Sequence, residues 1–321
     1  MSKYKVVLTD NIFPDLDLER SMLASVDAEL LEAKDNDHML KLITDADAVI
    51  NTYAKMSASV IEKLQKCKII VRNGIGVDTI DIKAASEKRI IVANVPSYCI
   101  DEVATHATAL ILACHRKIFY LEKKVKAGIW NVKLAAPITA PELSYVGLAG
   151  FGRIPRQVCK KVQALGFNVI AYDPYVAQED ADEYNVKMVN IPTLLKESDY
   201  ISIHCPLTEE TKGMFNYEAF KQMKKTAFII NTARGAVINE KELIAALQEG
   251  LIAGAALDVL EKDGITPDHP LLKMDNVIIT PHAAWYSEQS IIKRRKQTIE
   301  AVINVLNGGE PESFVNRKMI A

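Results

Sequence analysis

Residues 145–173, YVGLAGFGRIPRQVCKKVQALGFNVIAYD, decide the fold of this chain. The first five residues are apolar on both faces, as in a buried strand of a parallel sheet. Gly150 and Gly152 then turn the chain, because glycine tolerates backbone conformations that other residues avoid. Apolar residues next recur at helical spacing, at positions 154, 158, 162 and 165, and Gly166 stops the helix before the apolar run 167–172. The stretch predicts a strand, a glycine turn, a helix and a second strand.

This glycine turn has the features of a dinucleotide-binding site. Gly150 and Gly152 allow the backbone to approach a pyrophosphate, and the amides of Arg153 and Ile154 at the helix N-terminus can donate to it. Asp173 follows Gly150 at the distance where a carboxylate accepts hydrogen bonds from the adenosine ribose. The sequence therefore predicts an NAD site.

Residues beside the motif refine this prediction. Asp173 would repel the 2′-phosphate of NADP, and Pro174 and Tyr175, which follow it, offer no cation. Pro155 stands where the dinucleotide fingerprint usually has its third glycine. Proline fits the first turn of a helix but has no N–H for a phosphate. Such a turn also occurs in ordinary strand–helix connections, so the prediction depends on the motifs that follow.

Length and composition limit the classes of function. A chain of 321 residues predicts two domains, and a hydrophobic content of 49% is ample for two cores. The net charge of −2, with scattered Lys and Arg, offers no basic surface to nucleic acid. The longest apolar run, residues 107–114, is too short to span a membrane, and the first residues do not resemble a signal peptide. We expect a small-molecule partner and a cytoplasmic location.

The cysteines predict neither disulfides nor a metal site. Their number, five, is odd, and they share no C-x-x-C spacing. Most lie in apolar surroundings, so we expect reduced thiols in the core. They occupy positions 67, 99, 114, 159 and 205.

Strand and helix patterns also alternate before residue 100, which predicts a first parallel sheet without the dinucleotide motif. One of its strands runs into Arg72-Asn-Gly-Ile-Gly-Val-Asp78, a glycine loop at the end where open α/β sheets bind ligands. Two interpretations stay open: a tight turn, or amides that bind a carboxylate. A long helix is then predicted from residue 101 to 126, followed by an arm, residues 128–141, whose Trp130 favours packing on a second subunit.

Polar residues follow the later strands at the ligand side of the second sheet. Arg234 and Asp258 each lie at the end of a predicted strand, and His282 follows the last one. A guanidinium can bind a carboxylate or polarise a carbonyl, and a histidine can transfer a proton near neutral pH. Beside NAD, these groups predict hydride transfer between a 2-hydroxy acid and a 2-oxo acid.

Taken together, these motifs resemble the D-isomer-specific 2-hydroxyacid dehydrogenases, and most closely the C-terminal binding protein branch of that family. The resemblance covers nearly the whole chain. It is carried by VRNGIGVDTIDI (71–82), GFGRI with the later YDPY (172–175), HCPLTEET (204–211), NTARGAVI (231–238), ALDVLE (256–261) and TPHAAWYSEQ (280–289).

The resemblance implies two doubly wound parallel-sheet domains of flavodoxin-like and Rossmann type. An NAD domain, residues 100–285, would be inserted into a discontinuous substrate domain, residues 1–99 and 286–321. Arg234 would bind and polarise the substrate, and His282 would be the acid/base. Arg72 with the amides of Ile75 and Gly76 would bind the substrate carboxylate, and family members are usually homodimers.

Further positions are implied to line the cofactor or the substrate. Trp285 would either pack between domains or wall the substrate pocket, and its position shortly after His282 favours the wall. Beyond the glycine turn and Asp173, the implied cofactor-binding residues are His204, Cys205, Pro206, Thr211, Thr232, Ala233, Asp258 and His282.

One catalytic position departs from the family pattern. The family has a glutamate five residues after the aspartate that corresponds to Asp258, and here that position is Asp263. Glu261 is the alternative carboxylate. We expect Asp263 to assist His282.

A different class of function is also possible for this branch. A dinucleotide-sensing interaction protein of the corepressor type would bind NAD with little catalysis. The chain has no long disordered tail and no basic patch, which favours the enzyme.

Overall fold

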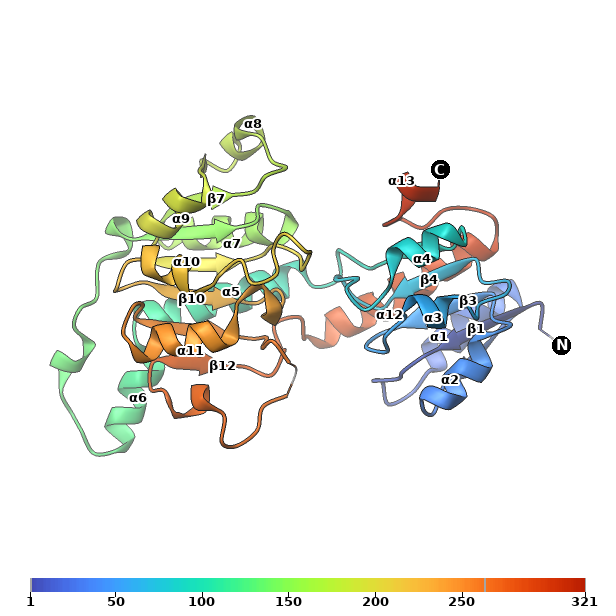
Figure 1. The fold of residues 1–321 in the computed structure, drawn as a ribbon, viewed down its shortest axis with the longest axis horizontal. Helices are drawn as coiled ribbons and strands as arrows, with labels where there is room; N and C mark the ends of the chain where they lie inside the picture. The colour runs from blue at the N-terminus through green and yellow to red at the C-terminus, as the bar shows by residue number, and fades with distance from the viewer. Residues whose placement is uncertain (1, 263, 321) are drawn as a thin grey trace. The chain divides into compact units, whose positions relative to one another are not determined.

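The computed structural model describes residues 2–262 and 264–320. The chain divides into two compact units: unit 1 is Met1–Cys99 with Ser287–Ala321, and unit 2 is Ile100–Tyr286 (Figure 1). Asp263, the predicted catalytic carboxylate, lies outside the described residues. Among the residues described, no helix combines the length and the apolar composition that a membrane-spanning segment needs.

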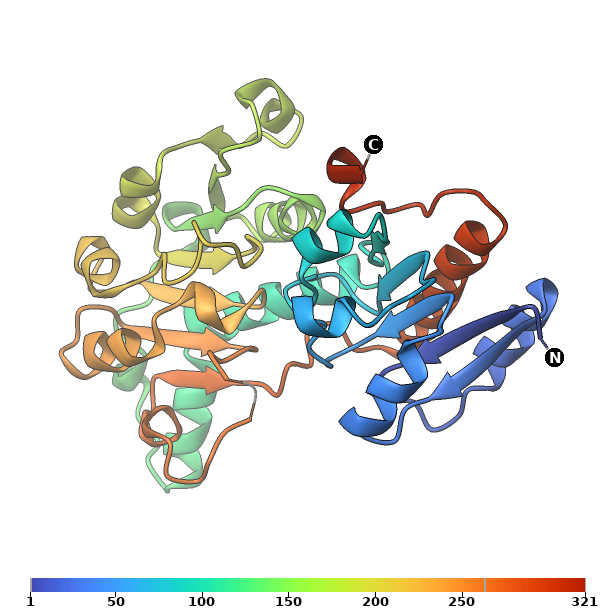
Figure 2. The same cartoon turned by 45° about the vertical axis from the view of Figure 1, so that its right-hand side comes forward.

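Unit 1 is built on a five-stranded parallel sheet with the order β2-β1-β3-β4-β5. This is the strand order of flavodoxin-like doubly wound folds, which confirms the predicted class of the first domain. Figure 2 shows these strands side by side. They are β1 (Tyr4–Leu8), β2 (Ala28–Glu32), β3 (Ala48–Asn51), β4 (Ile69–Arg72) and β5 (Ile91–Ala93).

Helices cover both faces of this sheet. Side chains on β4 alternate between two cores: Ile69 and Val71 face the core formed with α1 and α12, and Ile70 faces the core formed with α2, α3 and α4. Burial on both faces explains the continuous apolar runs of these strands. The helices are α1 (Asp17–Leu23), α2 (Asn36–Ile43), α3 (Ala58–Ile61), α4 (Ile82–Glu87), α12 (Glu288–Leu306) and the C-terminal α13 (Arg317–Ile320).

Unit 2 is built on a seven-stranded parallel sheet with the order β12-β11-β10-β9-β6-β7-β8. The order runs outward from β6 in both directions, as in the Rossmann fold, with the reversal between β6 and β9. Open α/β sheets bind ligands at the carboxyl ends of the strands at such a reversal. The strands are β6 (Tyr145–Ala149), β7 (Asn168–Tyr172), β8 (Lys187–Met188), β9 (Tyr200–Ile203), β10 (Phe228–Asn231), β11 (Gly254–Leu257) and β12 (Val277–Ile279).

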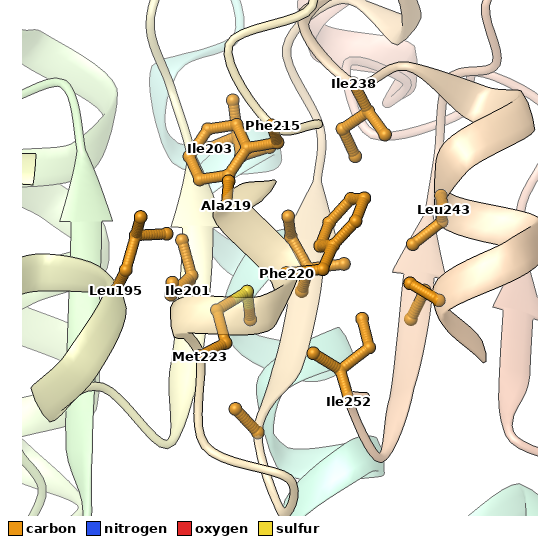
Figure 3. Packing of buried hydrophobic residues seen from close by; sticks show 14 of the residues in the cluster. Leu195, Ile201, Ile203, Phe215, Ala219, Phe220, Met223, Ile238, Leu243 and Ile252 are labelled. Carbon is orange, nitrogen blue, oxygen red and sulfur yellow. The ribbon is translucent and has the colours of Figure 1, made fainter. Parts of the chain in front are cut away.

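Two cores hold the helices of unit 2 against this sheet. One core packs α5 and α7 on one face, and the other packs α9, α10 and α11 on the opposite face. Figure 3 shows Phe220 at the centre of the second core. The helices are α5 (Ile100–His115), α6 (Ile118–Lys126), α7 (Arg153–Ala164), α8 (Gln178–Asp182), α9 (Ile191–Glu197), α10 (Tyr217–Gln222) and α11 (Glu240–Gln248).

The prediction of one continuous helix from residue 101 to 126 is wrong. α5 ends at His115, and Lys117 adopts a left-handed backbone conformation with φ of 52° before α6 begins. The Lys117 amide donates to the Cys114 carbonyl at 3.1 Å, which closes the turn between the helices. The arm, residues 128–141, then runs along the outside of unit 2 (Figure 1), and its Trp130 is 89% exposed.

Candidate active site

The glycine turn after β6 packs against the loop after β9. Gly150 has a φ of +102°, and a Cβ there would lie 3.0 Å from the carbonyl carbon of His204 and from the amide nitrogen of Cys205. Both the backbone conformation and this close approach favour glycine. A Cβ at Gly152, in contrast, would meet nothing within 4 Å. The turn is therefore fixed at Gly150 and leaves room for a ligand at Gly152.

The N-terminus of α7, beside this open space, has the geometry to bind an anion. Gly152 is the N-cap, and Arg156 donates its amide to the Gly152 carbonyl at 3.2 Å. The amides of Arg153 and Ile154 precede that bond and have no acceptor within the helix. Pro155 is buried in the same first turn, where its missing N–H breaks no helical hydrogen bond.

Asp173 follows β7 and binds the glycine turn directly. One carboxylate oxygen accepts a hydrogen bond from the Phe151 amide at 2.8 Å, and the other accepts from the Tyr175 amide at 2.9 Å. The carboxylate is thus held beside the turn, and its oxygens retain lone pairs for further donors such as ribose hydroxyls. Burial, helped by the charge of Asp173, raises the pKa of the Cys205 thiol to about 11.

The loop after β9 contributes neutral groups to this edge. Burial lowers the pKa of His204 to about 3, so its imidazole is uncharged at neutral pH. The Nε2 atom of His204 lies 2.8 Å from Ser202 Oγ. Thr211 closes the exposed turn that follows, because its hydroxyl donates to the Pro206 carbonyl at 2.6 Å.

The loop after β10 carries Arg234 and touches the loop after β11. The Arg234 side chain is half-buried, and its Nη1 donates to the Ala233 carbonyl at 2.8 Å. The hydroxyl of Thr232 is buried and finds no hydrogen-bond partner among the described residues. A Cβ at Gly235 would lie 1.8 Å from the Leu260 carbonyl oxygen, so glycine is needed for this contact between the loops.

Asp258 closes β11 and organises the loop that carries His282. Its side chain is buried, and Oδ1 accepts hydrogen bonds from the Thr280 hydroxyl at 2.5 Å and from the Ala283 amide at 2.9 Å. The other oxygen accepts from the Ala284 amide at 2.9 Å. The Asp258 carbonyl accepts from the His282 amide at 2.8 Å. His282 has a φ of 52°, which is uncommon outside glycine, and these bonds hold it there.

Strand order brings these loops to one edge of the sheet. β10, β11 and β12 are parallel neighbours, so the loops that carry Arg234, Asp258 and His282 leave the sheet side by side. Farther along the same edge come the loop after β9, the glycine turn and Asp173. No group of three or more His, Cys, Asp and Glu side chains that could hold a metal is found among the residues described.

The loop that follows β11 is tied by Glu240 of α11. One Glu240 oxygen accepts a hydrogen bond from the Glu261 amide at 3.1 Å, and the other lies 3.1 Å from Nε2 of His269. The Leu271 amide donates to Nδ1 of His269 at 3.3 Å, so Nε2 carries the proton and donates to Glu240. The Glu261 side chain is exposed.

In unit 1, the glycine loop after β4 is shaped around Arg72. A Cβ at Gly74 would lie 1.5 Å from Nη1 of Arg72, so the guanidinium fills the space of the missing side chain. That nitrogen donates to the Asn73 carbonyl at 2.7 Å. Asn94 fixes the far side of the loop by donating to the Ile75 carbonyl at 2.6 Å. Gly74 therefore serves the placement of a buried cation in addition to a tight turn.

Two further predicted substrate residues, Gly76 and Trp285, are half-buried. Gly76 is half-buried in the same loop of unit 1. Trp285 is half-buried in unit 2, where its ring lies edge-on to Tyr286 with the ring centres 5.6 Å apart.

The sequence reasoning missed two polar residues that contact Asp258. His106, from α5, lies 3.0 Å from the Thr280 hydroxyl and 3.6 Å from the Asp258 carboxylate, measured from Nε2. A lone histidine on a helix that begins the domain gives no local signal for such a role. Thr280 begins the motif of residues 280–289, but only the fold reveals which carboxylate it contacts.

Comparison with known proteins shows which family this chain resembles. Residues 108–284 match the family described as D-isomer specific 2-hydroxyacid dehydrogenase, NAD binding domain. A D-3-phosphoglycerate dehydrogenase of Archaeoglobus fulgidus is 40% identical over 268 residues, which are 84% of this chain and 51% of that protein. A hydroxypyruvate reductase of Thermotoga maritima is 39% identical over 290 residues, which are 88% of this chain and 92% of that protein.

A solved structure is similar over both units. The D-lactate dehydrogenase of Aquifex aeolicus, in complex with NAD and lactic acid, has a TM-score of 0.87 at 29% identity and covers 97% of this chain and 98% of that one. The chain spans only 51% to 59% of the length of two archaeal D-3-phosphoglycerate dehydrogenases that it matches. The open space at Gly152, the helix N-terminus and Asp173 fit a dinucleotide, and NAD is the cofactor of unit 2. The chain belongs to the D-isomer specific 2-hydroxyacid dehydrogenase family.

Proposed function

We propose that this protein is an NAD-dependent oxidoreductase that interconverts a 2-oxo acid and a D-2-hydroxy acid. The observation that carries the proposal is the arrangement along one sheet edge. A dinucleotide cradle at β6 and β7 is followed on the same edge by the loops of Arg234 and His282. A cofactor that starts at Asp173 and crosses the glycine turn would reach toward these two side chains.

In this proposal the cofactor contacts come from several loops of unit 2. Asp173 binds the ribose, the turn and the α7 amides bind the pyrophosphate, and the loops after β9 to β12 line the rest. The buried Thr232 hydroxyl, which has no partner among the residues described, is a donor available to a bound group. The residues assigned are Gly150, Gly152, Arg153, Ile154, Asp173, His204, Cys205, Pro206, Thr211, Thr232, Ala233, Asp258 and His282.

The proposed chemistry divides between Arg234 and His282. NAD, when bound, supplies or accepts the hydride at the substrate carbon. In reduction, His282 donates a proton to the carbonyl oxygen, which becomes the hydroxyl, and in oxidation it takes that proton back. The guanidinium of Arg234 donates hydrogen bonds to the substrate carboxylate or carbonyl and favours the negative charge that builds on oxygen.

A histidine that donates a proton near neutral pH needs a carboxylate to hold that proton. We assign this role to Asp263, with Glu261 as the alternative. The Glu261 amide donates to Glu240 and the Glu261 side chain is exposed to solvent, which supports Asp263 over Glu261.

We assign substrate recognition to Arg72, to the amides of Ile75 and Gly76, and to Trp285. The buried guanidinium of Arg72 at a strand end suits a carboxylate, and Trp285 offers an apolar wall to the substrate side chain. The domains would then be a substrate domain of residues 1–99 and 286–321 and an NAD domain of residues 100–285.

Replacement of Trp285 with Ala should change the ranking of substrates more than the affinity for NADH.

The test is steady-state oxidation of NADH with a panel of 2-oxo acids. Relatives of this chain carry the names glyoxylate reductase and hydroxypyruvate reductase, so glyoxylate, hydroxypyruvate and medium-sized apolar 2-oxo acids form the panel. Turnover that is lost in Arg234→Ala supports the proposal. Tight NADH binding without turnover on any member would instead support the dinucleotide-sensing interaction protein of the corepressor type.

We further propose that the protein is a homodimer joined through unit 2. Apolar side chains are exposed along α6 and the arm, including Phe119, Trp130 and Val132, and water-exposed apolar surface of this kind marks an interface. In light scattering, the Trp130→Ser and Val132→Ser double variant should shift toward monomer. Tyr175→Ser, which removes another exposed aromatic, is the matched control.

A further inference from the structure

A chain of hydrogen bonds connects α5 to the loop that carries His282. Nε2 of His106 lies 3.0 Å from the hydroxyl oxygen of Thr280, and that oxygen lies 2.5 Å from Oδ1 of Asp258. The His106 side chain is 25% exposed, so it is not a core residue held by packing alone. It lies 174 positions from Thr280 in the sequence.

The direction of these bonds follows from the chemistry of the groups. An ionised carboxylate only accepts, so the Thr280 hydroxyl donates its hydrogen to Asp258. The Thr280 oxygen is then an acceptor for His106, whose Nε2 must carry the proton. Each group in the chain orients the next one.

Asp258 passes this orientation to the backbone around His282. Its two carboxylate oxygens hold the amides of Ala283 and Ala284, and its carbonyl holds the amide of His282. The left-handed conformation of His282 directs its side chain, and an uncommon conformation persists only where the surroundings determine it. Rotation of the Asp258 carboxylate would release both of the amides that follow His282.

We propose that His106 is a positioning residue for the reaction: through Thr280 and Asp258 it fixes the backbone that presents His282. This inference rests on the proposed function for the role of His282. It assigns to His106 no contact with substrate or cofactor.

The experiment compares His106→Leu, which removes the donor, with His106→Gln, whose amide nitrogen can donate from a position near that of Nε2. His106→Leu should lower kcat about tenfold, because small displacements of a catalytic group are costly, and leave KM for NADH within about twofold. His106→Gln should restore most of kcat. Thr280→Val should match His106→Leu, and the double variant should be no worse than either single one.

The matched control lies on the same helix. The Thr108 hydroxyl donates to the Ala104 carbonyl at 2.7 Å and takes no part in this chain, so Thr108→Val should leave kcat unchanged. If His106→Leu and Thr108→Val lower kcat equally, or if Gln fails to restore it, His106 has only a structural role and the proposal is overturned.

A second readout does not depend on catalysis. Hydrogen exchange of the Ala283 and Ala284 amides, measured by NMR, should be about tenfold faster in His106→Leu than in the unmodified protein and in Thr108→Val. Unchanged exchange would overturn the inference even if the enzyme is active. Faster exchange in a protein that reduces no 2-oxo acid would support the hydrogen-bond chain and reject the proposed function.

Discussion

The two ends of the sheet edge in unit 2 are built in different ways. At the end formed by β6 and β7, a glycine turn, a helix N-terminus and Asp173 come from one short stretch of sequence. At the other end, Arg234 and His282 depend on contacts between three loops and α5. The end at β6 and β7 therefore has a local geometry suited to the dinucleotide. The end that carries Arg234 and His282 depends on tertiary contacts that must all form together.

The largest effect should come from His282 at the second end. His282→Gln removes the proposed proton donor and should lower kcat by about 10²- to 10⁴-fold, the usual range for general acid–base catalysis. Dissociation of NADH, followed by fluorescence, should change little. A variant that keeps kcat within about threefold of the unmodified protein would contradict the assignment.

Substitutions of Gly152 and Gly235 distinguish the effect on cofactor binding at one end of the sheet edge from the effect on packing at the other end. Gly152→Ala adds a methyl group in open space, so stability should be unchanged while the Kd for NADH rises about tenfold, which is about 1.4 kcal/mol. Gly235→Ala forces a methyl group against the Leu260 carbonyl and should lower the free energy of unfolding by about 1–3 kcal/mol.

Urea unfolding measures the free energy of unfolding of both variants, and titration with NADH measures their Kd. Each variant is the control of the other, because one changes binding and the other changes packing. Equal loss of stability in the two would show that Gly152 is a packing residue, and the difference between the ends would disappear.

A smaller effect is expected at Asp173. The carboxylate would repel the 2′-phosphate of NADP, so Asp173→Ala should reduce the preference for NAD over NADP about tenfold. The substitution also releases the amides of Phe151 and Tyr175, which then become available to the phosphate. Equal use of both cofactors by the unmodified protein would contradict this prediction.

The smallest effect should be a shift in pH dependence at the second end. If Asp263 holds the proton on His282, Asp263→Asn should move the alkaline limb of the reduction profile about one pH unit lower, because loss of a nearby negative charge weakens proton binding. Glu261→Gln should do little, and Asp263→Glu should retain or extend activity at high pH. The reverse pattern would assign the role to Glu261.

The β6–β7 end was easier to predict from the sequence than the end that carries Arg234 and His282. The strand, the glycine turn, α7 and Asp173 were predictable because their signals are local: apolar period, glycine position and helix stop. The doubly wound architecture of both units followed from the alternation of strand and helix patterns. The break at Lys117 was not predictable, since a single left-handed residue leaves the apolar pattern intact.

The arrangement around Asp258 was outside the reach of sequence reasoning. The sequence placed Asp258 at a strand end and its family resemblance placed it on the cofactor. The structure adds that both of its oxygens accept hydrogen bonds from residues 22 to 26 positions later. Only the pairing of β11 with β12 brings those residues together, and no local spacing indicates it.

The packing of Arg72 against Gly74 in unit 1 couples the residues that evolution can accept at these two positions. The guanidinium occupies the volume in which any side chain at position 74 would begin, so a side chain at position 74 would displace Arg72. A variant with alanine at both positions removes that clash, but it has lost the cation and keeps the strain of a side chain at a φ of +155°. Selection for folding alone would retain Gly74 and tolerate the loss of Arg72, whereas selection for the proposed substrate binding would retain both residues. The residue found at position 72 beside an unchanged Gly74 would therefore show which of the two selective pressures a related protein has experienced.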